Sequence, residues 1–142
     1  MQKLLFLVIL LILNFSCFDD KNYIPIVSVN IELDLNLPEY EQVNTIGNSL
    51  FITGGIKGII VYHFATNEYK AYDRNCSYEP SLQCAKIDSI YSSIAFCGCC
   101  SSAFLLDQNG TAANSPAINP LREYSCVLNE DNNTLHIFNK YY

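Results

Sequence analysis

Most of this chain shows the alternation of apolar and polar residues that is typical of β-strands. In residues 27–35, valine, isoleucine or leucine occupies every odd position and a polar residue every even one. This pattern predicts a half-buried strand that ends before Pro38. Shorter apolar runs, separated by turn residues, predict further strands. These lie at residues 50–52, 58–62, 69–72, 94–96, 103–106, 124–128 and 134–138.

The residues between these runs predict hairpins and tight turns. Residues 66–68 and residues 129–133 each separate two predicted strands and are rich in asparagine and other turn formers. Residues 107–110 (Asp-Gln-Asn-Gly) predict a tight turn with glycine at a positive φ. The sequence has no capped helical period, and residues 39–43 fit a single helical turn at most. Many short strands at regular spacing therefore indicate an all-β sandwich or barrel.

The first seventeen residues have the pattern of an export signal. Lys3 is followed by ten apolar residues, 4–13. They match the core of a signal peptide and are too few to span a bilayer, for which about 20 are needed. Residues 14–17 (Asn-Phe-Ser-Cys) resemble the lipobox of bacterial lipoproteins, in which the cysteine, here Cys17, is acylated and becomes the mature N-terminus. A plain secretory signal with an incidental cysteine is the alternative.

The chain is thus expected to have three parts. Residues 1–16 are interpreted as a lipoprotein signal peptide, residues 17–26 as an acidic tether that begins at the lipidated Cys17, and residues 27–142 as one domain. Several acyl chains on one cysteine hold a protein firmly in a membrane. We therefore expect the protein in the bacterial cell envelope, at the outer membrane or on the periplasmic face, where thiols can oxidise.

Composition and charge exclude several classes of function. The chain has 142 residues, of which 50% are hydrophobic and 15% charged, which excludes a disordered tail. Its net charge is −6, and it lacks the clustered lysine and arginine that nucleic-acid binding requires. It also lacks a Ser-His-Asp set, paired carboxylates and a phosphate-binding glycine loop. Nothing in the sequence therefore supplies an enzyme's own catalytic residues.

Apart from Cys17 the chain has six cysteines, and five of them fall within 25 residues. They are Cys76, Cys84, Cys97, Cys99, Cys100 and Cys126. In an oxidising compartment these thiols can pair in many ways, and sequence alone does not choose among them. Two cysteine-bearing loops between strands are also typical of a metal knuckle. Cys126 lies in a predicted strand, where we expect it to be a buried small hydrophobe.

Five of the cysteines belong to two short boxes, which a proline-containing loop follows. Residues 76–78 (Cys-Ser-Tyr) with Cys84 form the first box, residues 97–104 (Cys-Gly-Cys-Cys-Ser-Ser-Ala-Phe) the second, and residues 115–121 (Ser-Pro-Ala-Ile-Asn-Pro-Leu) the loop. This arrangement resembles the Rieske iron–sulfur family. The family's boxes are Cys-x-His followed by a cysteine and Cys-x-Cys-His-Gly-Ser-x-Phe, and its loop is Gly-Pro-Ala-x-x-Pro-Leu. The resemblance covers residues 71–124.

The resemblance implies a fold and a role for several residues. The expected fold is a Rieske-like antiparallel β-sandwich or barrel whose cluster-binding tip, residues 74–120, is built from loops. By position, Cys76 and Cys97 correspond to the thiolate ligands of one iron. A pair that joins the loops by a disulfide in the family corresponds to Cys84 and Cys99.

Three further positions depart from the family or add to its site. Tyr78 and Cys100 stand where the family has the histidine ligands of the second iron, so a centre with two cysteine and two histidine ligands does not fit this chain. Ser102 corresponds to the serine whose hydroxyl donates a hydrogen bond to a bridging sulfide. In an empty site its hydroxyl would instead serve the loop backbone.

Three interpretations of the site remain open on the sequence. In the first, Cys100 is a third thiolate, and Tyr78 or Cys84 completes a [2Fe–2S] site; Cys84 is the better ligand because tyrosine ionises only near pH 10. In the second, four thiolates hold a structural Zn²⁺. These would be Cys76, Cys84, Cys97 and Cys100. In the third, the chain binds no metal and disulfides such as Cys84–Cys99 staple the loops.

The sequence therefore predicts a Rieske-like envelope lipoprotein. Its expected activity is one-electron transfer through a [2Fe–2S] centre with cysteine-rich ligation, in exchange with a redox or envelope protein that the sequence does not identify. The alternative is a binding or structural lipoprotein of the same fold without a cluster, held together by disulfides or by zinc. Its expected contact with the membrane is through the N-terminal lipid.

Overall fold

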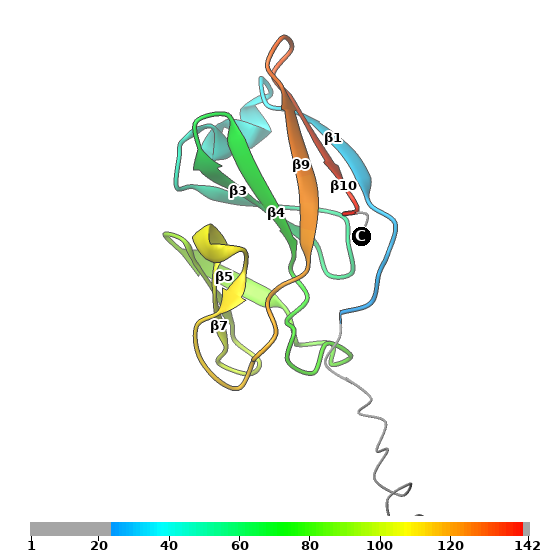
Figure 1. Ribbon diagram of the computed structural model, residues 1–142, viewed down its shortest axis with the longest axis vertical. Helices are drawn as coiled ribbons and strands as arrows, with labels where there is room; N and C mark the ends of the chain where they lie inside the picture. Colours follow the sequence, from blue (N-terminus) through cyan, green and yellow to red (C-terminus); the bar gives the residue numbers. More distant parts are fainter. Residues whose placement is uncertain (1–23, 141–142) are drawn as a thin grey trace, which may run out of the picture.

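The computed structural model describes residues 24–140, and these form an all-β domain (Figure 1). The predicted signal peptide, Cys17 and the first part of the tether lie outside the described residues. None of the helices within residues 24–140 has the length and apolar character needed to cross a membrane. In chain order the elements are β1 (Asn30–Asp34), the 3-10 helix η1 (Pro38–Asn44), β2 (Ser49–Ile52), β3 (Ile59–Ala65), β4 (Glu68–Asp73), β5 (Ile87–Tyr91), β6 (Ile94–Cys97), β7 (Ala103–Leu105), the 3-10 helix η2 (Leu106–Gln108), β8 (Thr111–Ala112), β9 (Glu123–Asn129) and β10 (Thr134–Phe138).

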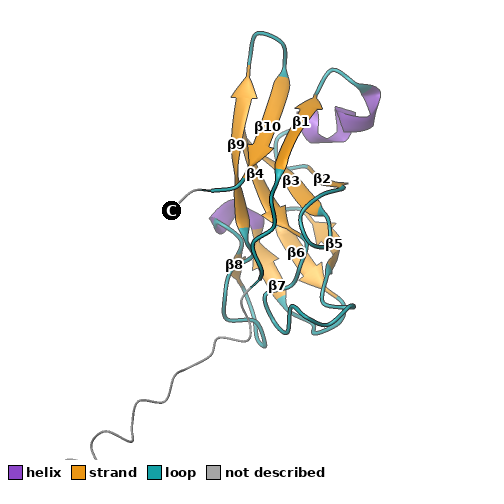
Figure 2. Cartoon of the chain, turned by 90° about the vertical axis from the view of Figure 1, so that its right-hand side faces the viewer, coloured by secondary structure: helices purple, strands orange, loops and turns teal. Residues whose placement is uncertain are grey.

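The strands form two antiparallel sheets. The larger has the order β1-β10-β9-β4-β3-β2, and the smaller has the order β5-β6-β7-β8. Figures 1 and 2 both show the smaller sheet and its loops at one end of the larger sheet. Three loops form that end of the molecule, which we call the tip: residues 74–86, residues 98–102 and residues 113–122. The all-β class expected from the sequence is confirmed.

The strands predicted from apolar runs agree closely with the observed ones, whereas two short strands were missed. Both predicted hairpins, β3–β4 and β9–β10, are present. The alternating segment 27–35 contributes β1, and Val29, Leu33 and Leu35 within it are buried. Pattern analysis missed β5 because Asp88 and Ser89 interrupt its apolar residues at a bulge. It also missed β8, which has only two residues.

The core has two parts, which meet at β3 and β4. Ile60 and Tyr72 belong to the cluster that extends into the small sheet, where Phe104 is fully buried. Ile59 and Val61 belong to the cluster on the opposite face, under β1 and β10. Both faces of β3 are therefore covered, which explains why its sequence reads as a continuous apolar run and not as an alternation.

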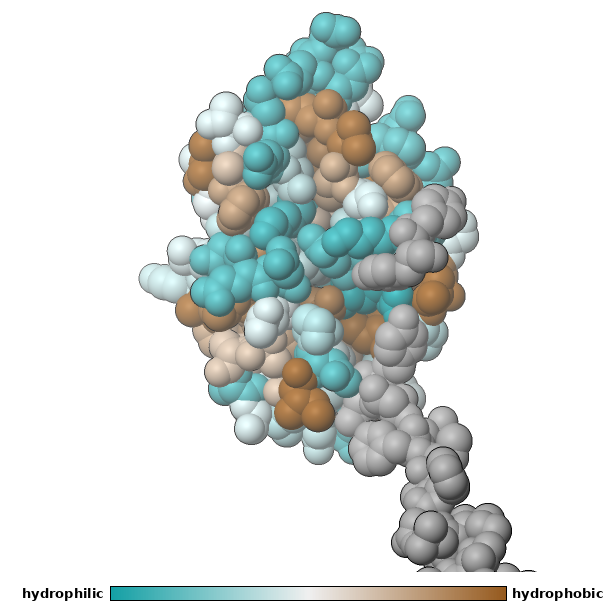
Figure 3. Space-filling model, in the orientation of Figure 1, coloured by the Kyte–Doolittle hydropathy of each residue, from teal (hydrophilic) through white to brown (hydrophobic). Residues whose placement is uncertain are grey.

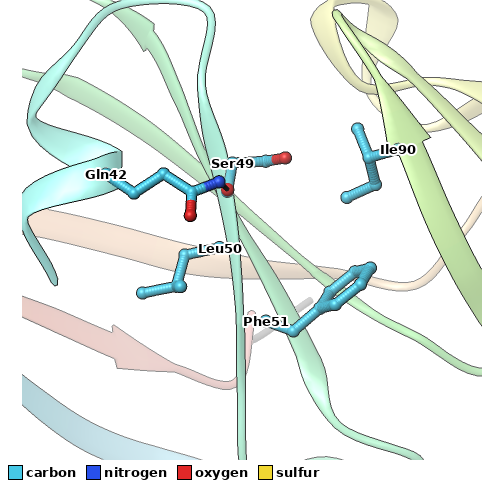
Figure 4. A pocket seen from close by; sticks show the side chains of 5 residues that line it. All are labelled: Gln42, Ser49, Leu50, Phe51 and Ile90. Atoms are coloured by element: carbon cyan, nitrogen blue, oxygen red, sulfur yellow. Dashed lines mark hydrogen bonds between the residues drawn. The ribbon is translucent and has the colours of Figure 1, made fainter. Parts of the chain in front are cut away.

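A shallow pocket lies where the edge of the large sheet approaches β5 (Figure 4). Its volume is about 260 Å³, and it is lined by Gln42, Ser49, Leu50, Phe51 and Ile90. The Gln42 side-chain amide donates a hydrogen bond of 2.8 Å to the Ser49 carbonyl and so joins η1 to β2. None of the five lining residues is a cysteine, a histidine or a carboxylate, so the pocket offers no group for metal or acid–base chemistry.

A buried carboxylate fixes the chain where β4 leaves the sheet for the tip. Asp73 is fully buried, and its Oδ2 accepts hydrogen bonds of 2.7 Å from both the Ile56 amide and the Tyr124 hydroxyl. Its Oδ1 accepts a 2.8 Å hydrogen bond from the Asn75 amide. Gly55 is required beside it, because a Cβ there would lie 2.4 Å from Oδ2 and its φ is +59°. One side chain thus joins three separate segments.

Removing one donor from this carboxylate should destabilise the whole domain. We expect Tyr124→Phe to lower the free energy of unfolding by about 1 to 2 kcal/mol, since a buried hydrogen bond is lost and its acceptor stays desolvated. Urea unfolding followed by circular dichroism measures this change. The control is Tyr91→Phe, at a side chain that is 82% exposed, which should change stability little. Equal midpoints for the two variants would contradict the role given to Asp73.

Candidate metal centre

Three thiols converge inside the tip. Cys76 lies in the loop after β4, Cys97 ends β6, and Cys100 lies in the turn that follows it. Their sulfur atoms all lie within 4.8 Å of one another, and the sulfurs of Cys76 and Cys100 are 3.4 Å apart. Cys76 and Cys97 are buried, whereas Cys100 is partly exposed. The structure therefore brings together three of the ligands expected from the sequence.

The backbone of the second box explains this convergence. The Cys97 amide donates to the Ser102 carbonyl, and the Ser101 amide donates to the Cys97 carbonyl, both at 2.9 Å. Ser101 has a φ of 60°, in the left-handed region that sharp turns use. The turn reverses the chain between β6 and β7, and Cys100 within it therefore lies beside Cys97. In the first box the Cys76 amide donates to the Ala85 carbonyl at 3.0 Å.

The two box loops are joined covalently on their exposed side. Cys84 and Cys99 form a disulfide, with 5.5 Å between their Cα atoms. The thiol of Cys84 is therefore bonded to Cys99 and is no longer free to bind a metal. This corrects the two sequence interpretations that used Cys84 as the fourth thiolate, in the [2Fe–2S] site and in the zinc site. The pairing is the one that the family resemblance implied.

The surroundings of Cys76 and Cys100 shift the pKa values of these two thiols in opposite directions. Burial raises the pKa of the Cys76 thiol well above its usual value, although the Tyr78 amide, which hydrogen-bonds the sulfur, partly opposes the rise. Burial also raises the pKa of Cys100. Hydrogen bonds with Ser102, Cys97 and Cys76 outweigh this effect and hold the pKa of Cys100 below its usual value. A metal must therefore displace a proton from Cys76, while Cys100 is closer to being a ready ligand.

Ser102 connects the thiols to the proline-containing loop. Its Oγ lies 3.2 Å from the sulfur of Cys100 and accepts a 3.0 Å hydrogen bond from the Ala117 amide. Because the amide fills one acceptor position, the hydroxyl hydrogen can point towards a Cys100 thiolate. A second link runs from the Ser77 hydroxyl, which donates to the Asn119 carbonyl at 2.6 Å. The loop of residues 113–122 is thus fastened to both boxes.

A lysine holds the first box from outside. The ammonium group of Lys57 donates to the carbonyls of Pro80, Leu82 and Ala85, at 3.1, 2.5 and 2.9 Å. Partial burial lowers the pKa of Lys57, and the nearby Cys76 partly opposes this by favouring the charged form. Sequence reasoning missed Lys57, because nothing in the glycine-containing segment around it indicates which loop its side chain reaches.

Tyr78 lies beside this group, whereas the two histidines of the chain, His63 and His136, and Cys126 lie apart from it. The side chain of Tyr78 is partly buried and packs on the core cluster that contains Cys76 and Cys97. His63 is buried on β3 with its Nδ1 2.9 Å from the Val43 carbonyl, and His136 on β10 pairs with the Asn30 side chain at 2.6 Å. Cys126 packs against the other core cluster. Both histidines therefore make contacts within the six-stranded sheet and its neighbouring helix η1.

The donor set suits a metal that prefers sulfur. Thiolates at about 2.3 Å from a tetrahedral Zn²⁺ lie about 3.8 Å apart. The observed separations, 3.4 Å for one pair and at most 4.8 Å for the others, bracket that spacing. Sulfur ligands also suit iron–sulfur clusters, for which a fourth ligand is needed. Among the family positions only Tyr78 is left for that role.

Removing the Ser102 hydroxyl should change the reactivity of Cys100. In Ser102→Ala we expect a higher pKa for Cys100, and hence about tenfold slower alkylation at neutral pH for each unit of the shift. Mass spectrometry of the peptide that carries Cys100, after timed iodoacetamide treatment of metal-free protein between pH 6 and 10, measures the rate. Ser125→Ala on β9 serves as the control. An unchanged pH profile would show that the hydroxyl does not stabilise the thiolate.

Comparison with known proteins bears on the fold. No protein-family model matches the chain, and neither does any curated protein. Among solved structures, the chain is similar to one in a complex of reduced oxygenase and oxidised ferredoxin in carbazole 1,9a-dioxygenase. The TM-score is 0.52 at 14% identity, over 82% of this chain and 97% of the other. At that identity the likeness establishes the architecture alone: this chain has a Rieske-like fold, and three of its free thiols converge at the loop-built tip.

Proposed function

We propose that this protein is an iron–sulfur electron carrier of the bacterial cell envelope, attached to the membrane through a lipid on Cys17. The observation that carries the metal site is the convergence of three unpaired thiols between the two box loops. Cys76, Cys97 and Cys100 would hold a [2Fe–2S] cluster, with Tyr78 at the fourth ligand position. When bound, such a cluster supplies one-electron chemistry.

The surroundings of the thiols favour a bound group over free thiols. Three thiols within 4.8 Å would be prone to oxidise with one another in an oxidising compartment, and binding a metal protects them. Burial of Cys76 and Cys97 excludes water from the inner side of the site. The Cys84–Cys99 disulfide joins the two loops around the site, and the Lys57 contacts restrain the first of them.

A single Zn²⁺ held by the same three thiols is the second candidate. It is favoured by the sulfur separations themselves, since three ligands within 4.8 Å of one another can reach one ion. In that case the tip would be a structural site without redox function, and the protein a binding module.

Metal and sulfide analysis of the protein purified without air separates these candidates. We expect two irons and two acid-labile sulfides per chain, with a visible absorption spectrum that Cys76→Ser and Cys97→Ser abolish. Cys126→Ser is the matched control, because Cys126 lies on β9 against the other core cluster and should leave the iron content unchanged. One zinc per chain without sulfide would instead support the structural site. Protein with neither metal, and with its thiols free to alkylation, would overturn both.

The envelope location is supported by two separate features. The apolar run 4–13, which Cys17 follows after three residues, has the length and apolar character of an export signal. The Cys84–Cys99 disulfide is of a kind that persists outside the reducing cytoplasm.

Lipid attachment can be tested directly. Mass spectrometry of the native protein should find an acylated N-terminal cysteine at Cys17, and Cys17→Ala should move the protein from the membrane fraction or leave its signal uncleaved. The control is Cys126→Ser, which removes a cysteine from the folded domain and should remain in the membrane fraction. A free, unmodified N-terminus at another residue of the native protein would contradict the anchor.

A further inference from the structure

The tether joins the folded domain at the end that carries the thiols. Ile24, the first described residue, is buried, and its carbonyl accepts hydrogen bonds from Nε of Arg122, at 3.1 Å, and from Nη2. Arg122 ends the proline-containing loop of the tip, directly before β9. Figures 1 and 2 both show the beginning of the described chain beside the tip loops. The start of the domain is thus fastened to the tip.

Only a short stretch of chain separates this point from the proposed lipid. Six residues, 18–23, lie between Cys17 and Ile24. Even fully extended, the seven peptide steps from Cys17 to Ile24 span at most about 25 Å. A lipid on Cys17 therefore keeps Ile24, and the tip beside it, close to the membrane surface.

The tip also exposes large apolar side chains. Ile118, in the proline-containing loop, is 82% exposed, and Leu82, in the loop after β4, is 44% exposed. The two loops are linked by the hydrogen bond from Ser77 to Asn119. Ile26, two residues after the start of the described chain, is 68% exposed as well. Exposed apolar side chains on neighbouring loops are typical of a surface that contacts a partner or a membrane.

The distribution of charged residues also distinguishes the tip from the opposite end of the domain. The exposed acidic side chains Asp34, Glu39, Glu41, Glu130 and Asp131 lie at the opposite end of the six-stranded sheet, around the β9–β10 turn and η1. The β9–β10 turn, at the top of Figure 3, is hydrophilic. The three loops of the tip, by contrast, contain one acidic residue, Glu79, against three basic ones, Arg74, Lys86 and Arg122. An anionic lipid surface would repel the acidic end and accept the tip.

We propose that the tip of the domain lies against the membrane surface, with Leu82 and Ile118 in the lipid interface. This inference rests on the lipid anchor at Cys17 in the proposed function. It places the thiol centre at the membrane surface and the acidic end away from it.

The chain contains no tryptophan, so a single introduced tryptophan reports on its own position. We would prepare the full-length lipidated protein as Leu82→Trp, Ile118→Trp and Asn132→Trp, and reconstitute each into vesicles of phosphatidylethanolamine and phosphatidylglycerol with or without brominated acyl chains. Asn132 is exposed in the β9–β10 turn, at the acidic end, and is the matched control. We expect the bromolipids to quench the two tip variants at least threefold more strongly than Asn132→Trp. Two independent tip positions keep the test valid should one variant fail to fold.

Flotation of the same vesicles separates this inference from the lipid anchor. Protein that floats with the vesicles but is quenched equally weakly at all three positions would overturn the orientation and leave the anchor standing. Protein that does not float would overturn the anchor and, with it, the orientation. Tip tryptophans that bromolipids fail to quench, but that an envelope protein shields from aqueous iodide, would assign the apolar residues to a protein partner and also overturn the proposal.

Discussion

The geometry of the tip depends on the buried carboxylate of Asp73. This side chain ends β4, and its three hydrogen bonds fix the loop before β3, the start of β9 and the amide of Asn75, the residue before Cys76. A buried carboxylate must keep its partners, because desolvation without them costs several kcal/mol. The position of Cys76 is thus determined in part by the framework of the large sheet, through the residue before it. The second thiol-bearing box, which β6 and β7 flank, brings Cys97 and Cys100 to a thiol that this framework has positioned.

The sequence was most informative where structure depends on neighbouring residues. The hairpins β3–β4 and β9–β10 follow from local alternation and turn chemistry, so they were predictable. By contrast, β5 is broken by a bulge and is defined by its pairing with β6, which no local pattern contains. In the site, spacing placed Cys76, Cys97 and Cys100 in two loops, but their convergence requires the fold. Whether Cys84 binds a metal or pairs with Cys99 depends on the distance between the two loops in the folded protein. The sequence alone does not give that distance.

Some groups around the thiols restrain the loops, and others change the reactivity of the thiols themselves. The exposed disulfide and the three carbonyl contacts of Lys57 restrain the loops without using the converging sulfurs. Of the three converging thiols, Cys100 is partly exposed and hydrogen-bonded to Ser102, whereas Cys76 is buried, and burial raises its pKa. A metal that enters from solvent would therefore meet Cys100 first.

The pairing of β1 with β10 joins the two ends of the domain, from Asn30 opposite Phe138 to Asp34 opposite Thr134. Contacts between residues about a hundred positions apart make folding slow, because the long intervening chain must be ordered before they form. If the chain is exported as proposed above, this pairing would have to wait until β10 had crossed the membrane. Cys76, Cys84, Cys97, Cys99 and Cys100 precede β10 in the chain and would cross before it. The order of strands would then leave an interval in which these cysteines meet an oxidising compartment before the sheet is complete.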